Sequence, residues 1–188
     1  MLDTRDASDE ELLEAARKGD QRAFRGLVDR HHEALARTVA GMLGPGDAID
    51  DVLQEVFVQF YKNLTVFRGD SSVKTYLNRI AINRSLDVLR RRRRRLKRFV
   101  GLDEAGANQF AAESAEPSGP DETVWKAVDR LSDDQKAVVT LRLVDGYTTQ
   151  ETAEILGVRY GTVLSRLSRA SENLRMMLQP APGEDRPT

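Results

Sequence analysis

Hydrophobic and polar positions recur with a helical period along most of the chain, and the strict alternation typical of strands is missing. The clearest apolar stripe advances by three and four residues from Ile49 to Leu64 and leaves polar residues on the rest of the helix. Further stripes cover residues 8–19, 20–42, 73–98, 124–131, 132–145, 148–156 and 161–178. We therefore predict an all-α fold.

Local signals mark where several of these helices begin and end. Three pairs have capping-box spacing, in which a hydroxyl and a Glu or Gln three positions later satisfy each other's backbone N–H groups. They are Ser8 with Glu11, Ser132 with Gln135, and Thr148 with Glu151. Gly157 stands where a helix commonly ends in a left-handed residue.

The helical pattern disappears between residues 99 and 120 into Gly, Ala, Ser, Pro and acidic residues. We interpret this stretch as an acidic, flexible linker between two small helical domains, residues 8–98 and 121–178, with a flexible tail at 179–188. Because the linker has no apolar stripe to fold against, we expect the two domains to tumble semi-independently.

The net charge of −1 hides a strong segregation of charge along the chain. Residues 73–98 hold eleven Lys and Arg against one Asp, whereas residues 99–122 hold six acidic residues and no basic one. The run Arg90 to Arg95 continues a helix that also carries Lys74, Arg79 and Arg84, so one helical edge could follow a phosphate backbone. The alternative is a solvated charge run.

Residues 148–167 have the pattern of a helix-turn-helix motif. Ala153 is small where the helices would cross, Gly157 permits the sharp turn, and Val163 would fill the space between the helices. Thr162, Ser165, Arg166 and Arg169 are left on the outer face of the second helix, which is the one that enters a major groove. A helical hairpin with a solvated polar face is the alternative.

Catalysis and metal binding find little support. The chain has no cysteine, and its only histidines, His31 and His32, are adjacent and point in different directions on a helix, so they cannot share a metal ion. We expect no catalytic residue, no metal and no cofactor. The sequence shows no secretory signal and no apolar run near the roughly 20 residues that span a bilayer, so we expect a cytoplasmic protein without a membrane span.

Several motifs together resemble the extracytoplasmic-function (ECF, group IV) sigma factors of bacterial RNA polymerase. Residues 50–57, 67–72 and 76–83 with the arginine run are similar to the second conserved region of that family, and residues 161–170 to the fourth. The resemblance covers residues 10–98 and 121–178 in the family's order. It implies an alternative sigma factor that binds core RNA polymerase and directs promoter-specific initiation at −10 and −35 elements.

The resemblance also implies roles for individual residues. The residues implied to dock on the clamp of the largest polymerase subunit are Asp51, Gln54, Glu55 and Phe57. Those implied to contact the −10 element are Phe67, Arg68, Ser72, Tyr76, Arg79, Asn83, Arg84, Arg90 and Arg91. Those implied to contact the −35 element are Thr162, Leu164, Ser165, Arg166, Ser168 and Arg169. Phe57 and Tyr76 could instead be core residues.

Some departures and alternatives remain at this point. Tyr76 stands where the family usually has Trp, and Leu164 and Ser171 stand where it often has basic residues, so the family's −35 sequence preference does not transfer. A helix-turn-helix regulator that does not join polymerase is the main alternative function, and a helical scaffold is another. Family members commonly have an anti-sigma factor as a partner, but the sequence does not identify one.

Overall fold

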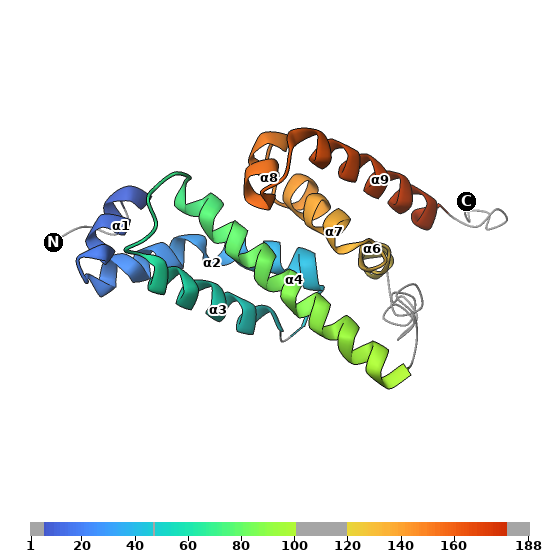
Figure 1. Ribbon diagram of the computed structural model, residues 1–188, viewed down its shortest axis with the longest axis horizontal. Helices are drawn as coiled ribbons and strands as arrows, with labels where there is room; N and C mark the ends of the chain where they lie inside the picture. The colour runs from blue at the N-terminus through green and yellow to red at the C-terminus, as the bar shows by residue number, and fades with distance from the viewer. Residues whose placement is uncertain (1–5, 47, 101–119, 180–188) are drawn as a thin grey trace.

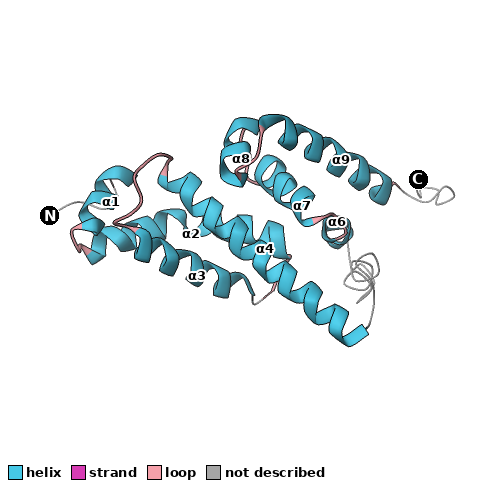
Figure 2. Cartoon of the chain, in the orientation of Figure 1, coloured by secondary structure: helices cyan, strands magenta, loops and turns pink. Residues whose placement is uncertain are grey.

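The computed structural model describes residues 6–46, 48–100 and 120–179, and no residue in these ranges lies in a strand (Figures 1 and 2). The all-α prediction is confirmed. The helices are, in order, α1 (Asp9–Arg17), α2 (Gln21–Leu43), α3 (Ala48–Asn63), α4 (Val73–Val100), α6 (Pro120–Asp129), α7 (Asp133–Val139), the π-helical turn η1 (Thr140–Val144), α8 (Thr149–Leu156) and α9 (Tyr160–Leu178).

Helices α1 to α4 form the N-terminal domain around an apolar core. Their fully buried side chains include Leu12, Leu27, Val56, Phe60 and Leu77, each on a stripe that the sequence marks. Burying one such side chain stabilises the fold by about 1.5–3 kcal/mol. The stripes therefore account for how these four helices assemble.

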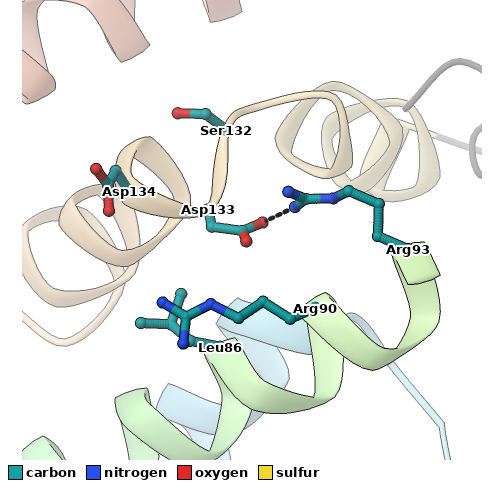
Figure 3. Close-up of a pocket in the computed structure, with 6 residues that line it drawn as sticks. All are labelled: Leu86, Arg90, Arg93, Ser132, Asp133 and Asp134. Carbon is teal, nitrogen blue, oxygen red and sulfur yellow. Dashed lines mark hydrogen bonds and ion pairs between the residues drawn. The ribbon is translucent and has the colours of Figure 1, made fainter. Parts of the chain in front are cut away.

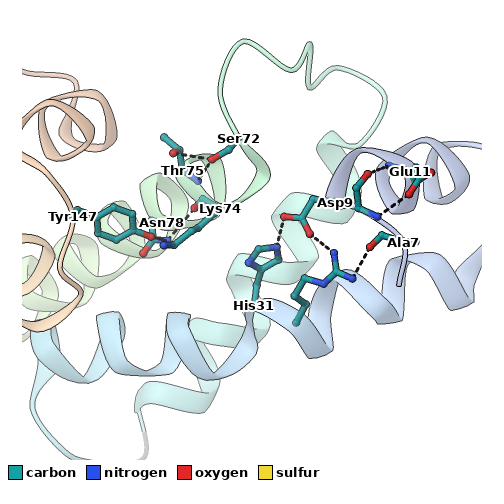
Figure 4. Close-up of polar contacts among 11 residues, drawn as sticks. Ala7, Asp9, Glu11, His31, Ser72, Lys74, Thr75, Asn78 and Tyr147 are labelled. Atoms are coloured by element: carbon teal, nitrogen blue, oxygen red, sulfur yellow. Dashed lines mark hydrogen bonds and ion pairs between the residues drawn. The ribbon is translucent and has the colours of Figure 1, made fainter. Parts of the chain in front are cut away.

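Polar contacts fix helix α1 at one end of this domain. The predicted capping box is present, since Glu11 N–H donates to Ser8 Oγ at 3.2 Å and Ser8 N–H donates to Glu11 Oε2 at 2.7 Å. Asp9 receives Arg30 Nη1 at 2.8 Å and lies 2.8 Å from His31 Nε2 (Figure 4). These contacts join α1 to α2.

Helices α6 to α9 form the C-terminal domain, which contains the predicted helix-turn-helix. Ala153 and Val163 pack with Val138 in one buried cluster, as the sequence indicates. Gly157 has a φ of 64° and ends α8 in the left-handed conformation. The backbone N–H and then the hydroxyl of Thr148 lower the pKa of Glu151, because both donate to its carboxylate in the predicted capping box.

The turn η1 was not predicted, because the sequence indicates one continuous helix from residue 132 to Gly146. Instead, Asp145 N–H donates to the carbonyl of Thr140 at 2.9 Å, a π-helical hydrogen bond across five residues. The fully buried Leu141 of this turn belongs to the same hydrophobic cluster as the N-terminal core. The wider turn thus lies in the contact between the domains.

The two domains pack against each other, so the expectation that they tumble semi-independently is wrong for this structure. Ala137, Leu141, Tyr147 and Ile155 of the C-terminal domain share one buried cluster with residues of α2 and α4. Figure 1 shows the C-terminal helices along one side of α4. Apolar side chains of the C-terminal domain are buried against the N-terminal domain, and this burial favours contact between the domains.

Some predicted segments lie outside the described residues. These are most of the linker, at 101–119, and the tail at 180–188. At the linker's edges, α4 continues to Val100 and α6 begins at Pro120. Among the helices that the structure describes, none is long and apolar enough to cross a membrane.

Candidate nucleic-acid interface

Helix α9 presents the residues predicted to read the −35 element. Ser165, Ser168 and Arg169 are exposed, Thr162 is partly exposed, and 46% of Leu164 is accessible. Val163 and Ala170 of the same helix are fully buried and fix its rotation on the domain. Helix α9 is therefore amphipathic, with one face buried in the domain and the opposite, polar face exposed to solvent.

Arg166 has a partner within its own domain. Its guanidinium Nη2 lies 2.5 Å from Asp134 Oδ2 at the start of α7. The sequence placed this arginine on the outer face of the helix, among the residues implied to contact the −35 element, and the structure pairs it with an acidic residue of its own domain. Arg166 is therefore less available to DNA than Arg169.

Helix α3 carries the residues predicted to dock on polymerase. Asp51, Gln54 and Glu55 are exposed, whereas Phe57 is buried to 9% accessibility and stacks on His32 with ring centroids 6.3 Å apart. The first three side chains can reach a partner protein. Phe57 instead supports the helix from within the domain.

The aromatic residues predicted for the −10 element pack on each other. Phe67 is only 8% accessible, its ring centroid lies 4.6 Å from that of the half-buried Tyr76, and the Tyr76 hydroxyl accepts from Asn63 Nδ2 at 3.2 Å. These rings form the base of the loop rather than an open stacking platform. Arg68 and Ser72 of the loop are exposed.

Arg17 holds the same loop from α1, and sequence reasoning missed it. Its Nε donates to the carbonyl of Leu64 at 2.8 Å, and its guanidinium also donates to the carbonyl of Phe67. These carbonyls follow the end of α3, where helical partners are lacking. No sequence signal connects Arg17 to a loop about fifty positions away.

Three polar residues of α4 that were predicted to contact the −10 element differ in their surroundings. Asn83 is exposed. Arg84 donates through two nitrogens to Gln59 Oε1, at 3.0 and 2.7 Å, and thus ties α4 to α3. Arg79 donates to the carbonyl of Glu154 in α8, at 2.7 Å, across the domain contact.

The arginine run has two kinds of member. Arg92 donates to the carbonyl of Leu43 at the end of α2, at 3.1 Å, and Arg93 forms an ion pair with Asp133 of α7 at 2.5 Å (Figure 3). A cavity of about 280 Å³ lies between α4 and the start of α7, and Arg93 and Asp133 line it. Arg90 also lines this cavity, although its side chain is largely exposed. Arg91 and Arg95 are exposed, and neither has an ion pair among the described residues. Arg91 and Arg95 are therefore the members available to phosphates.

Within the described ranges, no group of three or more His, Cys, Asp and Glu residues is arranged to hold a metal ion. What the structure brings together is an acidic and polar face on α3, a basic face on α4 and a polar face on α9. This combination fits a protein partner and two contacts with nucleic acid.

Comparison with known proteins agrees with this arrangement. Residues 27–95 match the family model of Sigma-70 region 2, and residues 121–174 match that of Sigma-70 region 4. The ECF RNA polymerase sigma-E factor of Escherichia coli (strain K12) is 35% identical over 184 residues, which cover 92% of this chain and 95% of the relative. The sigma-E factor of Haemophilus influenzae is 31% identical over 92% of this chain and 96% of its own length.

Two solved structures are also similar. The structure of CnrH in complex with the cytosolic domain of CnrY has a TM-score of 0.68 and 28% identity over 90% of this chain and 96% of that one. The sigma factor RpoE of Bartonella quintana, in complex with the anti-sigma factor NepR, shares the fold, with a TM-score of 0.66 and 24% identity over 82% of this chain and 96% of that one. The fold and its exposed faces thus define a two-domain sigma factor. The chain belongs to the ECF sigma factors of RNA polymerase.

Proposed function

We propose that this protein is an alternative sigma factor that binds core RNA polymerase and directs it to promoters with particular −10 and −35 elements. The observation that carries this function is that one chain combines sigma region 2 and sigma region 4, with exposed polar faces on α3, α4 and α9. A regulator that does not join polymerase would have no use for the α3 face. The sigma factor that we propose would act in the cytoplasm, where RNA polymerase works.

The polymerase contact is assigned to Asp51, Gln54 and Glu55 on α3. Their exposure supports this role, and the buried Phe57 supports the helix that presents them. Charged rim residues set orientation and association rate at protein interfaces. The docking surface is therefore a polar rim rather than an apolar pocket.

The DNA contacts are divided between the two domains. For the −10 element we assign Arg68, Ser72, Asn83, Arg90 and Arg91, which are exposed, together with Arg79 once its contact with α8 is released. Phe67, Tyr76 and Arg84 support this surface through their packing and hydrogen bonds. The residues assigned to the −35 element are Thr162, Leu164, Ser165, Ser168 and Arg169, and Arg166 positions α9.

An anti-sigma factor is a further partner that we propose for this chain. The similar sigma factor RpoE was solved with the anti-sigma factor NepR bound. Such a partner would act by covering polymerase-binding or DNA-binding surface.

Co-purification with core polymerase tests the function against its main alternative. We expect the full chain to migrate with core polymerase in gel filtration, at micromolar concentrations and in the absence of DNA. A chain that binds duplex DNA but does not co-migrate with core polymerase is a regulator of another kind, and the proposal would then be wrong.

A further inference from the structure

The loop between α3 and α4, residues 64–72, carries two of the residues assigned to the −10 element, Arg68 and Ser72. Its tip is exposed at Arg68, Gly69 and Asp70, and Gly69 has a φ of 80°, a left-handed conformation that favours glycine. A Cβ atom at Gly69 would meet no heavy atom within 4 Å, so the tip itself is not packed. The conformation of the tip therefore depends on how the base of the loop is held.

Arg17, at the end of α1, holds two carbonyls at the first end of this loop. Its Nε donates to the Leu64 carbonyl at 2.8 Å, and its Nη2 donates to the Phe67 carbonyl. Leu64 and Phe67 are only 4% and 8% accessible. A guanidinium presents its N–H groups in a rigid planar fork, so this one side chain fixes both carbonyls relative to α1.

Other hydrogen bonds complete the base of the loop from the helices that it connects. The Phe67 N–H donates to the Asn63 carbonyl, the last residue of α3, at 2.9 Å. At the second end, the Thr75 N–H of α4 donates to Ser72 Oγ at 3.1 Å (Figure 4). Arg17 is therefore the contact that ties this base to a third helix, α1, which lies beside the loop in Figure 1.

Helix α1 can support the loop because it is itself fixed on the domain. Its Leu12, Leu13 and Ala16 side chains are buried, and Asp9 Oδ1 lies 2.8 Å from Arg30 Nη1 of α2. Side chains that position a binding site are effective when they project from a rigid element rather than from another loop. The position of the loop is thus set by a packed helix.

The surroundings of Arg17 separate it from the arginines that are available to DNA. Its side chain is 24% accessible, and its third nitrogen, Nη1, forms an ion pair with Glu14 of α1. All three guanidinium nitrogens therefore have a partner within the N-terminal domain. Arg68 at the tip is exposed instead. A contribution of Arg17 to promoter recognition must therefore act through the loop.

We propose that Arg17 is a positioning residue for −10 recognition: by fixing the carbonyls of Leu64 and Phe67, it holds the loop in the conformation in which Arg68 and Ser72 meet the −10 strand. This inference rests on the proposed function. A base is discriminated only when the polar groups that read it keep a fixed geometry, whereas charge attracts phosphates in many geometries. Loss of Arg17 therefore lowers −10 discrimination more than overall affinity for DNA.

Transcription by core polymerase with the full chain measures this discrimination. The templates are one promoter identified by mapping its start site, and derivatives in which each −10 position is substituted in turn. We expect Arg17→Gln to reduce the ratio of initiation between the native and the substituted templates about three- to tenfold, a part of the roughly 5- to 150-fold that one mismatched base pair costs. Binding of Arg17→Gln to labelled core polymerase should equal that of the parent chain.

Two matched variants and a salt titration separate the carbonyl contacts from effects of charge. Glu14→Gln removes the ion pair of Arg17 but leaves both carbonyl contacts, and Arg25→Gln removes the same charge from an exposed position of α2. Both variants should keep the initiation ratio of the parent chain. A lost phosphate contact would lower the slope of log K against log salt for the promoter by about 0.7–0.9, whereas Arg17→Gln should leave this slope unchanged.

Hydrogen exchange in the free full-length chain measures the loop directly, without DNA or polymerase. Arg17→Gln should speed exchange of the backbone amides of residues 64–72 and leave those of α2 and α3 at the parent rate. If Arg17→Gln loses its helices by circular dichroism, Arg17→Lys takes its place in every measurement, since an ammonium lacks the planar fork of a guanidinium.

The outcomes separate the inference from the function on which it rests. An unchanged initiation ratio, unchanged loop exchange or a smaller salt slope overturns the positioning role. Equal loss of transcription from every template together with weaker core binding also overturns it, because Arg17 would then support the domain as a whole. If the parent chain does not direct core polymerase to defined start sites, the proposed function is wrong and the −10 consequence falls with it, whereas loop exchange still shows whether Arg17 holds the loop.

Discussion

Arg166 and Arg169 lie three positions apart on α9, but only one of them is tied to its own domain. Arg169 is exposed and shares a face with Thr162 and Ser165, whereas Arg166 pairs with Asp134. We predict that Arg169→Ala relaxes the −35 preference at one base pair by about 1–3 kcal/mol, the discrimination of a bidentate arginine on guanine. Binding to duplexes with each −35 base pair substituted in turn measures this.

The matched variant is Arg166→Ala. It should weaken all −35 duplexes alike and lower the free energy of unfolding by at most about 1 kcal/mol, because the Asp134 side of its ion pair is exposed to solvent. If Arg169→Ala weakens every duplex equally, α9 is rotated relative to this assignment.

Glu55 is predicted to contribute to polymerase docking. It is exposed on α3, and its Oε2 lies 3.6 Å from Arg84 Nη1. Glu55→Lys should weaken core binding by about tenfold or more, because it reverses a charge at a protein interface. Equilibrium binding to labelled core polymerase measures the effect. Glu33→Lys, on the exposed face of α2, is the control and should bind as the parent does.

Residue identity predicted some roles and not others. The polar positions of α3 and α9 are exposed as expected, because helical periodicity places residues on faces. Phe67 was predicted to contact the −10 element, and Tyr76 either to contact it or to be a core residue. Only three-dimensional packing shows their rings against each other. Arg17 gave no signal, since its hydrogen bonds are to backbone carbonyls distant in sequence.

At the scale of elements, the arginine run should divide by whether a side chain is held by another helix. Arg91→Gln with Arg95→Gln should reduce the slope of log K against log salt for promoter DNA by about 2, since each phosphate contact contributes about 0.9. Arg92→Gln with Arg93→Gln should instead lower stability, because these side chains bind the Leu43 carbonyl and Asp133. Salt titrations and thermal unfolding of both pairs measure this, and equal slopes for the two would contradict the division.

Helix boundaries were largely predictable because their signals are local. All three capping boxes are present, and Gly157 ends α8 as expected. The π-helical turn η1 was not predictable in the same way. Its sequence fits an ordinary α-helix. The wider turn coincides with burial of Leu141 against the N-terminal domain, and the local sequence pattern carries no information about a contact with another domain.

At the scale of the whole molecule, the domain contact should depend on pH. Burial raises the pKa of Asp145 only while the two domains are in contact, and the titratable and charged groups around it are then Arg37, Lys74 and Tyr147. Protonation of Asp145 therefore favours the contact between the domains. This stabilisation is fully present below the ordinary pKa of an aspartate and is lost as pH rises through the raised pKa of Asp145. The measurement is energy transfer between two dyes, one on Lys62→Cys of the N-terminal domain and one on Glu172→Cys of the C-terminal domain, in a chain that has no other cysteine. We predict that this transfer falls as pH rises through that window.

Asp145→Asn is the control for this pH dependence. An amide keeps a donor toward Thr38 and does not titrate, so its energy transfer should be independent of pH in the same window. An unchanged pH dependence in Asp145→Asn would assign the effect to other groups.

Domain packing was the feature that sequence could not predict. The acidic stretch at 99–120 indicates where the domains are separate along the chain, but it says nothing about whether their surfaces fit. That fit depends on the pairing of Gly41 with Thr140 and of Asn78 with Tyr147, residues 69 or more positions apart. Composition gives no information on such pairs.

Reconstituted transcription tests the central claim, that the chain directs polymerase to promoters. Core polymerase with and without the full chain would transcribe fragments of the source genome, and the 5′ ends of the transcripts would be mapped. We predict chain-dependent transcripts whose start sites lie downstream of two shared sequence elements at constant spacing, with fewer transcripts for Glu55→Lys than for Glu33→Lys. Transcripts that are the same with core polymerase alone would contradict the account.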